Sequence, residues 1–240
     1  MKKNEGIKRS GFHSIESIIK NNPHKIKKLF LPYSRDDQRL NNLIKMANEN
    51  DINFEISKKL KQDPEALISN EENLNFKDLK EFLRNAKDKE LLILILDNII
   101  DPRNLGACIR SAAVAEVDAL IINKHHCAPL NEVAHSVSAG GAEIVETFFV
   151  SNLVNCLKYL KKSNVTIFGL SEHANKNYTD CDFSISSAFI MGSEELGIRK
   201  KTSEYCDSLI GLNNNKNFKS FNVSVATGII LSEISRQRKC

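Results

Sequence analysis

Uninterrupted apolar stretches alternate with helix-spaced stretches over the last 150 or so residues of the chain. Residues 91–96 are all apolar with no polar alternation, which predicts a strand buried on both faces, as in a parallel sheet covered by helices. Further strands are predicted at 119–122, 146–150, 166–170, 188–191 and 208–212, and helices at 105–115, 130–139, 153–161 and 222–238. This alternation predicts an α/β fold with a mainly parallel sheet.

The front of the chain has its own, smaller pattern. A helix is predicted from Ser14, which could serve as its N-cap, and a second helix at 36–49. Strands are predicted at 26–31 and 52–56. The stretch that follows, to about residue 89, is polar and poor in large apolar residues, as linkers are. We therefore expect a small α/β domain at 1–70, a linker at 71–89 and a second domain at 90–240.

Composition narrows the class of protein. No apolar run approaches the roughly 18 residues that span a bilayer, and the charged N-terminus leads into no apolar stretch. We therefore expect no membrane contact and a cytoplasmic location. Six cysteines contain no Cys-x-x-Cys pair, and His125, His126 and Cys127 have no obvious further ligand nearby. Reduced thiols and no bound metal are the expectation.

Charge is unevenly distributed. Residues 1–62 hold 14 Lys and Arg against 7 Asp and Glu, whereas the remainder holds 20 against 23. A basic front domain predicts a polyanionic partner. The candidate contacts are Lys25, Lys27, Lys28, Lys58, Lys59 and Lys61.

Ligand sites in parallel sheets lie at the carboxyl ends of the strands, and three of the predicted turns there are unusual. The glycine fingerprint of dinucleotide-binding sites is absent, which disfavours a nucleotide-dependent dehydrogenase. The turns instead contain N-x-G-x-x-x-R at 104–110, G-x-E-x-x-G at 192–197 and S-x-N-V-S-V-A at 220–226. Each asparagine, serine or glutamate among them could simply cap a helix. A functional site is therefore predicted only from the three motifs taken together.

The three motifs, in this order, resemble those of the TrmH/SpoU-type RNA ribose 2′-O-methyltransferases of the SPOUT superfamily. The segment 11–17 also resembles the opening of that family's small L30e-like RNA-binding domain. The two-domain layout is most similar to that of the bacterial enzymes that methylate a guanosine ribose of 23S rRNA. A tRNA ribose methyltransferase and a non-catalytic RNA-binding or ribosome-assembly protein remain alternatives.

The resemblance implies a C-terminal trefoil knot, a homodimer, and S-adenosylmethionine as the methyl donor, with no metal required. It assigns catalytic positions to Asn104, Arg110, Glu194, Ser220 and Asn222. It assigns cofactor-binding positions to Leu170, Gly192, Leu212 and Phe221. Arg110 would either accept the ribose proton or remain cationic and stabilise the developing alkoxide.

One stretch departs from the family pattern. The third motif usually begins Ile-Pro-Met-x-Gly, and here residues 212–216 are Leu-Asn-Asn-Asn-Lys. A rigid proline turn and a conformationally free glycine are therefore missing. We expect altered loop geometry and cofactor affinity, with catalysis retained because Ser220 and Asn222 are present.

Overall fold

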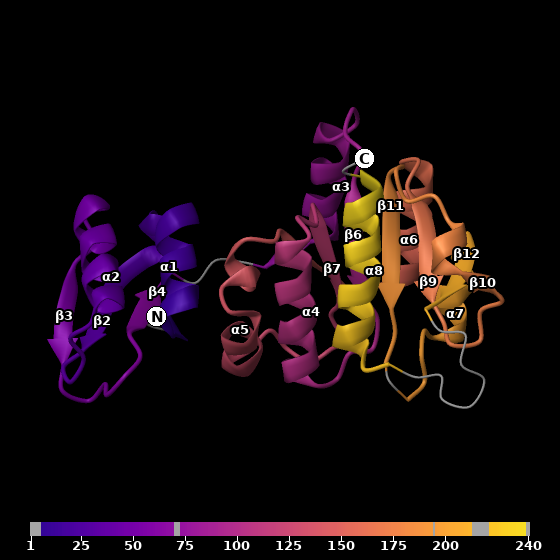
Figure 1. The fold of residues 1–240 in the computed structure, drawn as a ribbon. Helices are drawn as coiled ribbons and strands as arrows, with labels where there is room; N and C mark the ends of the chain where they lie inside the picture. The colour runs from indigo at the N-terminus through magenta and orange to yellow at the C-terminus, as the bar shows by residue number, and fades with distance from the viewer. Residues whose placement is uncertain (1–5, 70–72, 194, 213–220, 239–240) are drawn as a thin grey trace.

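The computed structural model describes residues 6–69, 73–193, 195–212 and 221–238, which form two sheets with their helices (Figure 1). The front sheet has the order β1-β4-β2-β3, and β2 and β3 are parallel while β4 is antiparallel to both of its neighbours. Its elements are β1 (Ile7–Ser10), α1 (Phe12–Asn21), η1 (Pro23–Lys25), β2 (Ile26–Pro32), α2 (Gln38–Glu49), β3 (Phe54–Ser57) and β4 (Glu65–Ile68). The predicted small α/β unit is confirmed.

The start of α1 differs from the prediction. The helix begins at Phe12 after Gly11, whose φ of 93° favours glycine, and Ser14 lies buried inside the first turn. Ser14 is therefore not the N-cap. At α2 the cap is Asp37, whose carboxylate accepts a 2.9 Å hydrogen bond from the Leu40 amide. That bond lowers the pKa of Asp37.

The second sheet has the order β10-β12-β9-β11-β6-β7-β8-β5, and every described pairing in it is parallel. Its strands are β5 (Leu74–Asn75), β6 (Leu92–Leu96), β7 (Ala119–Asn123), β8 (Thr147–Val150), β9 (Thr166–Leu170), β10 (Lys176–Asn177), β11 (Ser187–Met191) and β12 (Ser208–Gly211). The predicted mainly parallel sheet is confirmed.

Helices cover both faces of this sheet (Figure 1). The helical segments are α3 (Phe76–Asn85), α4 (Pro102–Val114), α5 (Glu132–Ser138), η2 (Gly141–Glu143), α6 (Leu153–Lys162), η3 (Tyr178–Asp180), α7 (Lys200–Ser203) and α8 (Val223–Arg238). Alternate residues of β6 divide between two cores: Leu94 packs with α4 and α8, and Ile93 packs with α3 and α6. This double burial explains the absence of polar alternation in the strand.

Part of the predicted linker belongs to the second sheet. Within 71–89, β5 pairs with β8, and α3 buries Leu79 and Leu83 in the core beside α6. A capping box between Asn75 and Asp78 starts this helix. The domain boundaries at 70 and 90 stay predictions.

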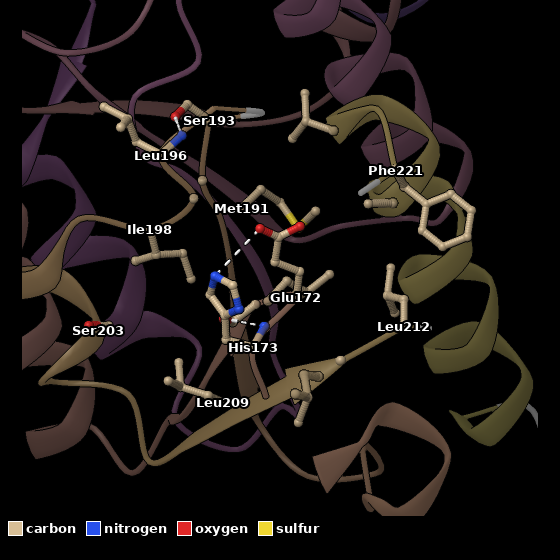
Figure 2. Close-up of a pocket in the computed structure, with 18 of the residues that line it drawn as sticks. Glu172, His173, Met191, Ser193, Leu196, Ile198, Ser203, Leu209, Leu212 and Phe221 are labelled. Atoms are coloured by element: carbon tan, nitrogen blue, oxygen red, sulfur yellow. Dashed lines mark hydrogen bonds and ion pairs between the residues drawn. The ribbon is translucent and has the colours of Figure 1, made fainter. Parts of the chain in front are cut away.

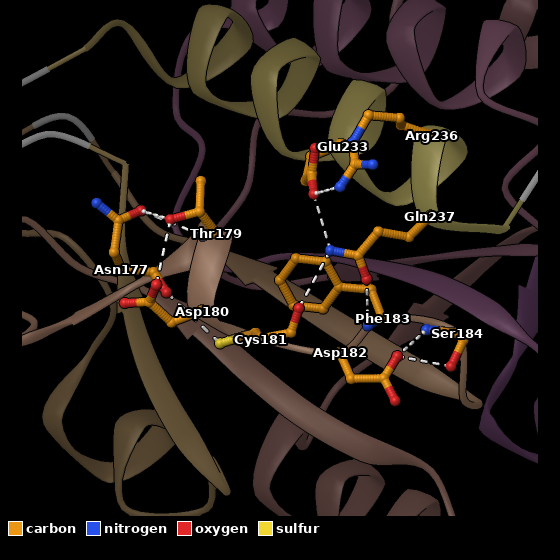
Figure 3. Close-up of polar contacts among 10 residues, drawn as sticks. All are labelled: Asn177, Thr179, Asp180, Cys181, Asp182, Phe183, Ser184, Glu233, Arg236 and Gln237. Carbon is orange, nitrogen blue, oxygen red and sulfur yellow. Dashed lines mark hydrogen bonds and ion pairs between the residues drawn. The ribbon is translucent and has the colours of Figure 1, made fainter. Parts of the chain in front are cut away.

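The C-terminal end of α8 is tied to the segment before β11 (Figure 3). The side chain of Gln237 accepts a 2.8 Å hydrogen bond from the Phe183 amide and donates one of 3.1 Å to the Cys181 carbonyl oxygen. Arg238 donates to the backbone carbonyl oxygens of Phe183 and Ile185. These bonds hold α8 at one position along its axis. They therefore also determine where its first turn lies. The trefoil knot stays a prediction, since residues 213–220 lie outside the described ranges.

Candidate functional site

A cavity of about 270 Å³ opens at the carboxyl ends of β9, β11 and β12 (Figure 2). The four predicted cofactor-binding residues, Leu170, Gly192, Leu212 and Phe221, all lie in its lining. Apolar side chains supply much of the remaining wall, and Ser171, Ser203 and Glu195 add polar groups. The apolar lining residues include Met191, Ile198, Leu209, Ile210 and Ala226, and the polar ones also include Glu172 and His173. A small cleft lined by both apolar and polar groups suits a flat organic ligand with polar substituents.

Gly192 forms the tightest part of the lining. A Cβ atom at this position would lie 2.1 Å from the carbonyl carbon of Gly197, so no other residue fits the backbone as it stands. The loop closes through two backbone hydrogen bonds between Ser193 and Gly197, of 2.9 and 3.1 Å. Gly197 has a φ of 62°, which also favours glycine. Gly192 is therefore required by the shape of the cavity wall, and the φ of Gly197 favours glycine.

An anchor behind this loop was missed by the sequence analysis. Asp97 is fully buried at the end of β6 and accepts hydrogen bonds from the Arg199 guanidinium, the Thr202 hydroxyl and the Asn123 amide. The closest contact joins Asp97 Oδ1 to Arg199 Nη2, at 2.7 Å. The interaction holds the segment between Ile198 and Ser203, both of which line the cavity. The available signal was an acidic residue directly after an entirely apolar strand.

The structure brings two of the predicted catalytic residues together. Asn222 Nδ2 donates a 3.2 Å hydrogen bond to Asn104 Oδ1, which connects the start of α8 to the first turn of α4. Asn222 Oδ1 also accepts hydrogen bonds from the amide and hydroxyl of Ser224, so the same side chain caps α8. Asn222 follows Phe221 of the cavity lining directly, which places the pair of asparagines beside the cavity.

Of the other three predicted catalytic residues, the structure describes only Arg110. Arg110 is exposed on α4, six residues beyond Asn104, and it is not part of the cavity lining of its own chain. Six residues of α-helix correspond to a rise of about 9 Å. Glu194 and Ser220 lie outside the described residues, as does the departing stretch from Asn213 to Lys216.

Two further observations concern the described part of the chain as a whole. No three His, Cys, Asp or Glu side chains in it gather as a metal site would require. None of its helices has the length and apolar character needed to cross a bilayer. The buried thiols of Cys108 and Cys156 pack in the two cores, and burial raises the pKa of Cys156 to about 12.

Comparison with known families identifies the chain. The model of the SpoU rRNA methylase family matches residues 91–232, and the model described as RNA 2'-O ribose methyltransferase substrate binding matches residues 10–63. The chain belongs to the SpoU rRNA methylase family. From here on, we call residues 6–69 the substrate-binding domain and the described residues from 73 to 238 the methylase domain.

Curated relatives cover nearly the whole chain. The 23S rRNA (guanosine-2'-O-)-methyltransferase RlmB of Shewanella oneidensis is 34% identical over 239 aligned positions, and the alignment covers 95% of this chain and 96% of the relative. The enzyme of the same name from Acinetobacter baylyi is 36% identical over 241 aligned positions, with the same coverage of both chains.

Solved structures show the same fold. The SpoU methyltransferase AviRb from Streptomyces viridochromogenes, in complex with AdoMet, superimposes with a TM-score of 0.82 at 18% identity, over 98% of this chain and 91% of that one. The A. aeolicus TrmH/SpoU tRNA modifying enzyme gives a TM-score of 0.56 at 29% identity, over 68% of this chain and 83% of that one.

Proposed function

We propose that this protein transfers a methyl group from S-adenosylmethionine to the ribose 2′-hydroxyl of a guanosine in 23S rRNA. The observation that carries the proposal is the Asn222–Asn104 hydrogen bond beside the cavity. It joins the first and third sequence motifs in space, although 118 residues separate them. The names of the full-length relatives supply the substrate.

The cavity fits the cofactor that the family implies. Leu170, Leu209 and Phe221 offer apolar surface for a purine ring, and the backbone at Gly192 is bare enough for close approach of a ligand. When bound, S-adenosylmethionine supplies an activated methyl group, so the protein needs only to bind, orient and handle the proton.

The proton of the ribose hydroxyl is the chemical difficulty, because a hydroxyl is a weak nucleophile until that proton leaves. We assign the critical role to Arg110, either as proton acceptor or as a cation that stabilises the alkoxide. Asn104 and Asn222 orient the ribose and the flanking loops, together with Glu194 of the second motif and Ser220 of the third. These residue roles rest on the motif positions and on the asparagine pair.

The RNA partner is supported by one edge of the substrate-binding domain. The parallel strands β2 and β3 end side by side there, with Pro32 opposite Ser57. Tyr33 follows with 63% of its surface exposed, and the Lys58 ammonium lies 5.7 Å from its ring centroid. Lys59 and Lys61 are exposed nearby in the sequence. Exposed aromatic rings stack on bases, and lysines neutralise phosphates.

We further propose that the protein acts as a homodimer in the cytoplasm. The helices on one face of the large sheet each carry an exposed apolar side chain: Val114 on α4, Val133 on α5 and Val225 on α8 are 80%, 43% and 49% exposed. Covering these side chains with a second copy of the chain would remove apolar surface from water. Val114→Glu should convert the dimer to a monomer in analytical ultracentrifugation, while an unchanged mass would contradict this interface.

An rRNA substrate is favoured over tRNA by how much of the chain each kind of relative matches. The rRNA-modifying relatives match the substrate-binding domain and the methylase domain together, whereas the tRNA modifying enzyme covers 68% of the chain. The test is to incubate the protein with methyl-labelled S-adenosylmethionine and either 23S rRNA or tRNA. Label recovered as 2′-O-methylguanosine from rRNA supports the proposal, and label recovered from tRNA alone would reject it.

A further inference from the structure

A four-residue segment, 140–143, touches three separate parts of the molecule. It lies between α5 and β8 in the methylase domain and packs against α4, against α5 and against α1 of the substrate-binding domain. Figure 1 shows α5 on the side of the large sheet nearest α1. Ala142 of this segment packs against the apolar core, whereas Gly140 and Glu143 make polar contacts.

Glu143 is the centre of a buried charge cluster across the two domains. Its Oε1 lies 3.1 Å from Arg9 Nε of strand β1 and 3.0 Å from His135 Nδ1 of α5, although the histidine N–H points away from the line of a good hydrogen bond. The three side chains are only 10%, 13% and 7% exposed, respectively. Burial tends to raise the pKa of Glu143, but His135 and Arg9 outweigh it and lower that pKa.

A buried ion pair is sensitive to the loss of one partner, because the remaining charge stays desolvated. The neighbouring residue on the same strand provides a contrast. Lys8 pairs with Glu65 at 3.5 Å, but the lysine side chain is 70% exposed and both residues belong to the substrate-binding domain. Exposed pairs of this kind contribute little. Of these two β1 residues, Arg9 is therefore the one that forms an ion pair with the methylase domain.

Gly140 and Gly141 allow the close approach of this segment to α1 and to α4. A Cβ atom at Gly140 would lie 2.7 Å from the His13 carbonyl oxygen of α1, and the Ser17 hydroxyl donates a buried 3.1 Å hydrogen bond to the Gly140 carbonyl oxygen. A Cβ atom at Gly141 would lie 3.3 Å from Cα of Arg110. Consecutive residues therefore contact α1 on one side and the backbone of the proposed catalytic arginine on the other.

We propose that Glu143 is a positioning residue, which with Arg9 and His135 locks the substrate-binding domain at a fixed place relative to Arg110. It touches neither the cavity nor the motif asparagines. Its effect on methylation rests on the proposed function: RNA held by the substrate-binding domain reaches Arg110 in register only when the two domains keep this arrangement.

The test uses the full chain with Glu143→Gln, which keeps the size of the side chain and removes its charge. Arg9→Gln is the second variant, because it breaks the same buried pair from the side of the substrate-binding domain. Glu65→Gln is the control, since it breaks the exposed pair on the same strand. Each variant is measured for kcat and KM with 23S rRNA, for S-adenosylmethionine affinity by calorimetry, and for amide hydrogen exchange in α1 and residues 140–145.

The lock predicts that both Glu143→Gln and Arg9→Gln raise the KM for RNA by about 10-fold or more. Cofactor affinity should stay within about twofold, and exchange in α1 and 140–145 should accelerate. Glu65→Gln should change none of these. Unchanged exchange in both lock variants would overturn the proposal even if no methylation is detected in any sample, because exchange reports the lock without the reaction. A parallel loss of cofactor affinity would also overturn it, as a sign of general damage.

Discussion

The hydrogen bond from Asn222 Nδ2 to Asn104 Oδ1, 3.2 Å long, joins the first turns of two helices that begin 121 residues apart. Asn222→Asp separates the two tasks of this side chain, because a carboxylate still caps α8 but cannot donate to Asn104. We expect kcat to fall by about 10- to 100-fold, with little change in melting temperature. Asn222→Ala should in addition destabilise the protein by about 1 kcal/mol. Wild-type turnover in the Asp variant would show that the bond is dispensable.

Arg110 is predicted to be indispensable for the chemistry and irrelevant to cofactor binding. Arg110→Ala should lower kcat by about a thousandfold or more, because no other described residue is assigned to the ribose proton. Its exposure on α4 makes damage to the fold unexpected. The control is Arg84→Ala on α3, which removes an equally exposed arginine. Circular dichroism and calorimetry with S-adenosylmethionine should match the wild type, and full turnover on 23S rRNA would refute the assignment.

Gly192→Ala is predicted to weaken the binding of S-adenosylmethionine. The new Cβ would collide with Gly197, and overpacking of this kind costs about 1–3 kcal/mol. If this cost falls on the bound state, the Kd for S-adenosylmethionine rises about 10- to 100-fold. Gly228→Ala on α8 is the matched control: a Cβ there meets no atom within 4 Å, so the helix should gain up to about 1 kcal/mol. Equal affinities in both variants would contradict the cofactor site.

The lysines that follow β3 are predicted to bind RNA phosphates. Replacing Lys58, Lys59 and Lys61 by alanine should weaken RNA binding and flatten its salt dependence by about 0.7–0.9 in logarithmic slope for each lost contact. The charge-matched control replaces three exposed lysines of the methylase domain, namely Lys77, Lys87 and Lys162. Filter binding over a range of salt concentrations measures the slope for each triple variant. Identical slopes for the two would show that Lys58, Lys59 and Lys61 do not contact RNA phosphates.

The stability of the protein should depend on pH because Glu143 titrates. Its pKa is lowered from the ordinary value of 4.5 in the folded state, so its ionisation stabilises the fold above pH 4.5 and this contribution is lost as the pH falls through the lowered pKa. The melting temperature of the wild type should therefore exceed that of Glu143→Gln at pH 6, and the difference should shrink toward pH 3. A difference that does not vary with pH would show that the glutamate is not ionised in the lock.

Much of the fold followed from local pattern. The strands β6, β7 and β11 of the large sheet are buried on both faces, and such strands are conspicuous in a sequence. The helix α3 was missed although its signal was present: Phe76, Leu79, Phe82 and Leu83 have helical spacing, but the many charged residues among them resembled a linker. The two-residue strands β5 and β10 are too short to give any periodicity.

Contacts between distant residues could not be predicted in this way. Asp97 and Arg199 are 102 positions apart, and Arg9 and Glu143 are 134 apart. Each of these residues alone resembles an ordinary surface charge. Their burial arises only when the chain folds. The motif residues were found because their order resembles a family, while the partners that hold those motifs in place required the structure.

The most direct measurement is a map of ribose methylation, by mass spectrometry, in rRNA and tRNA from a strain that lacks this protein. The account predicts the loss of one 2′-O-methylguanosine from 23S rRNA, with tRNA unchanged and the modification restored by the wild-type chain but not by Arg110→Ala. An intact set of 23S rRNA ribose methylations in that strain would contradict the proposed function.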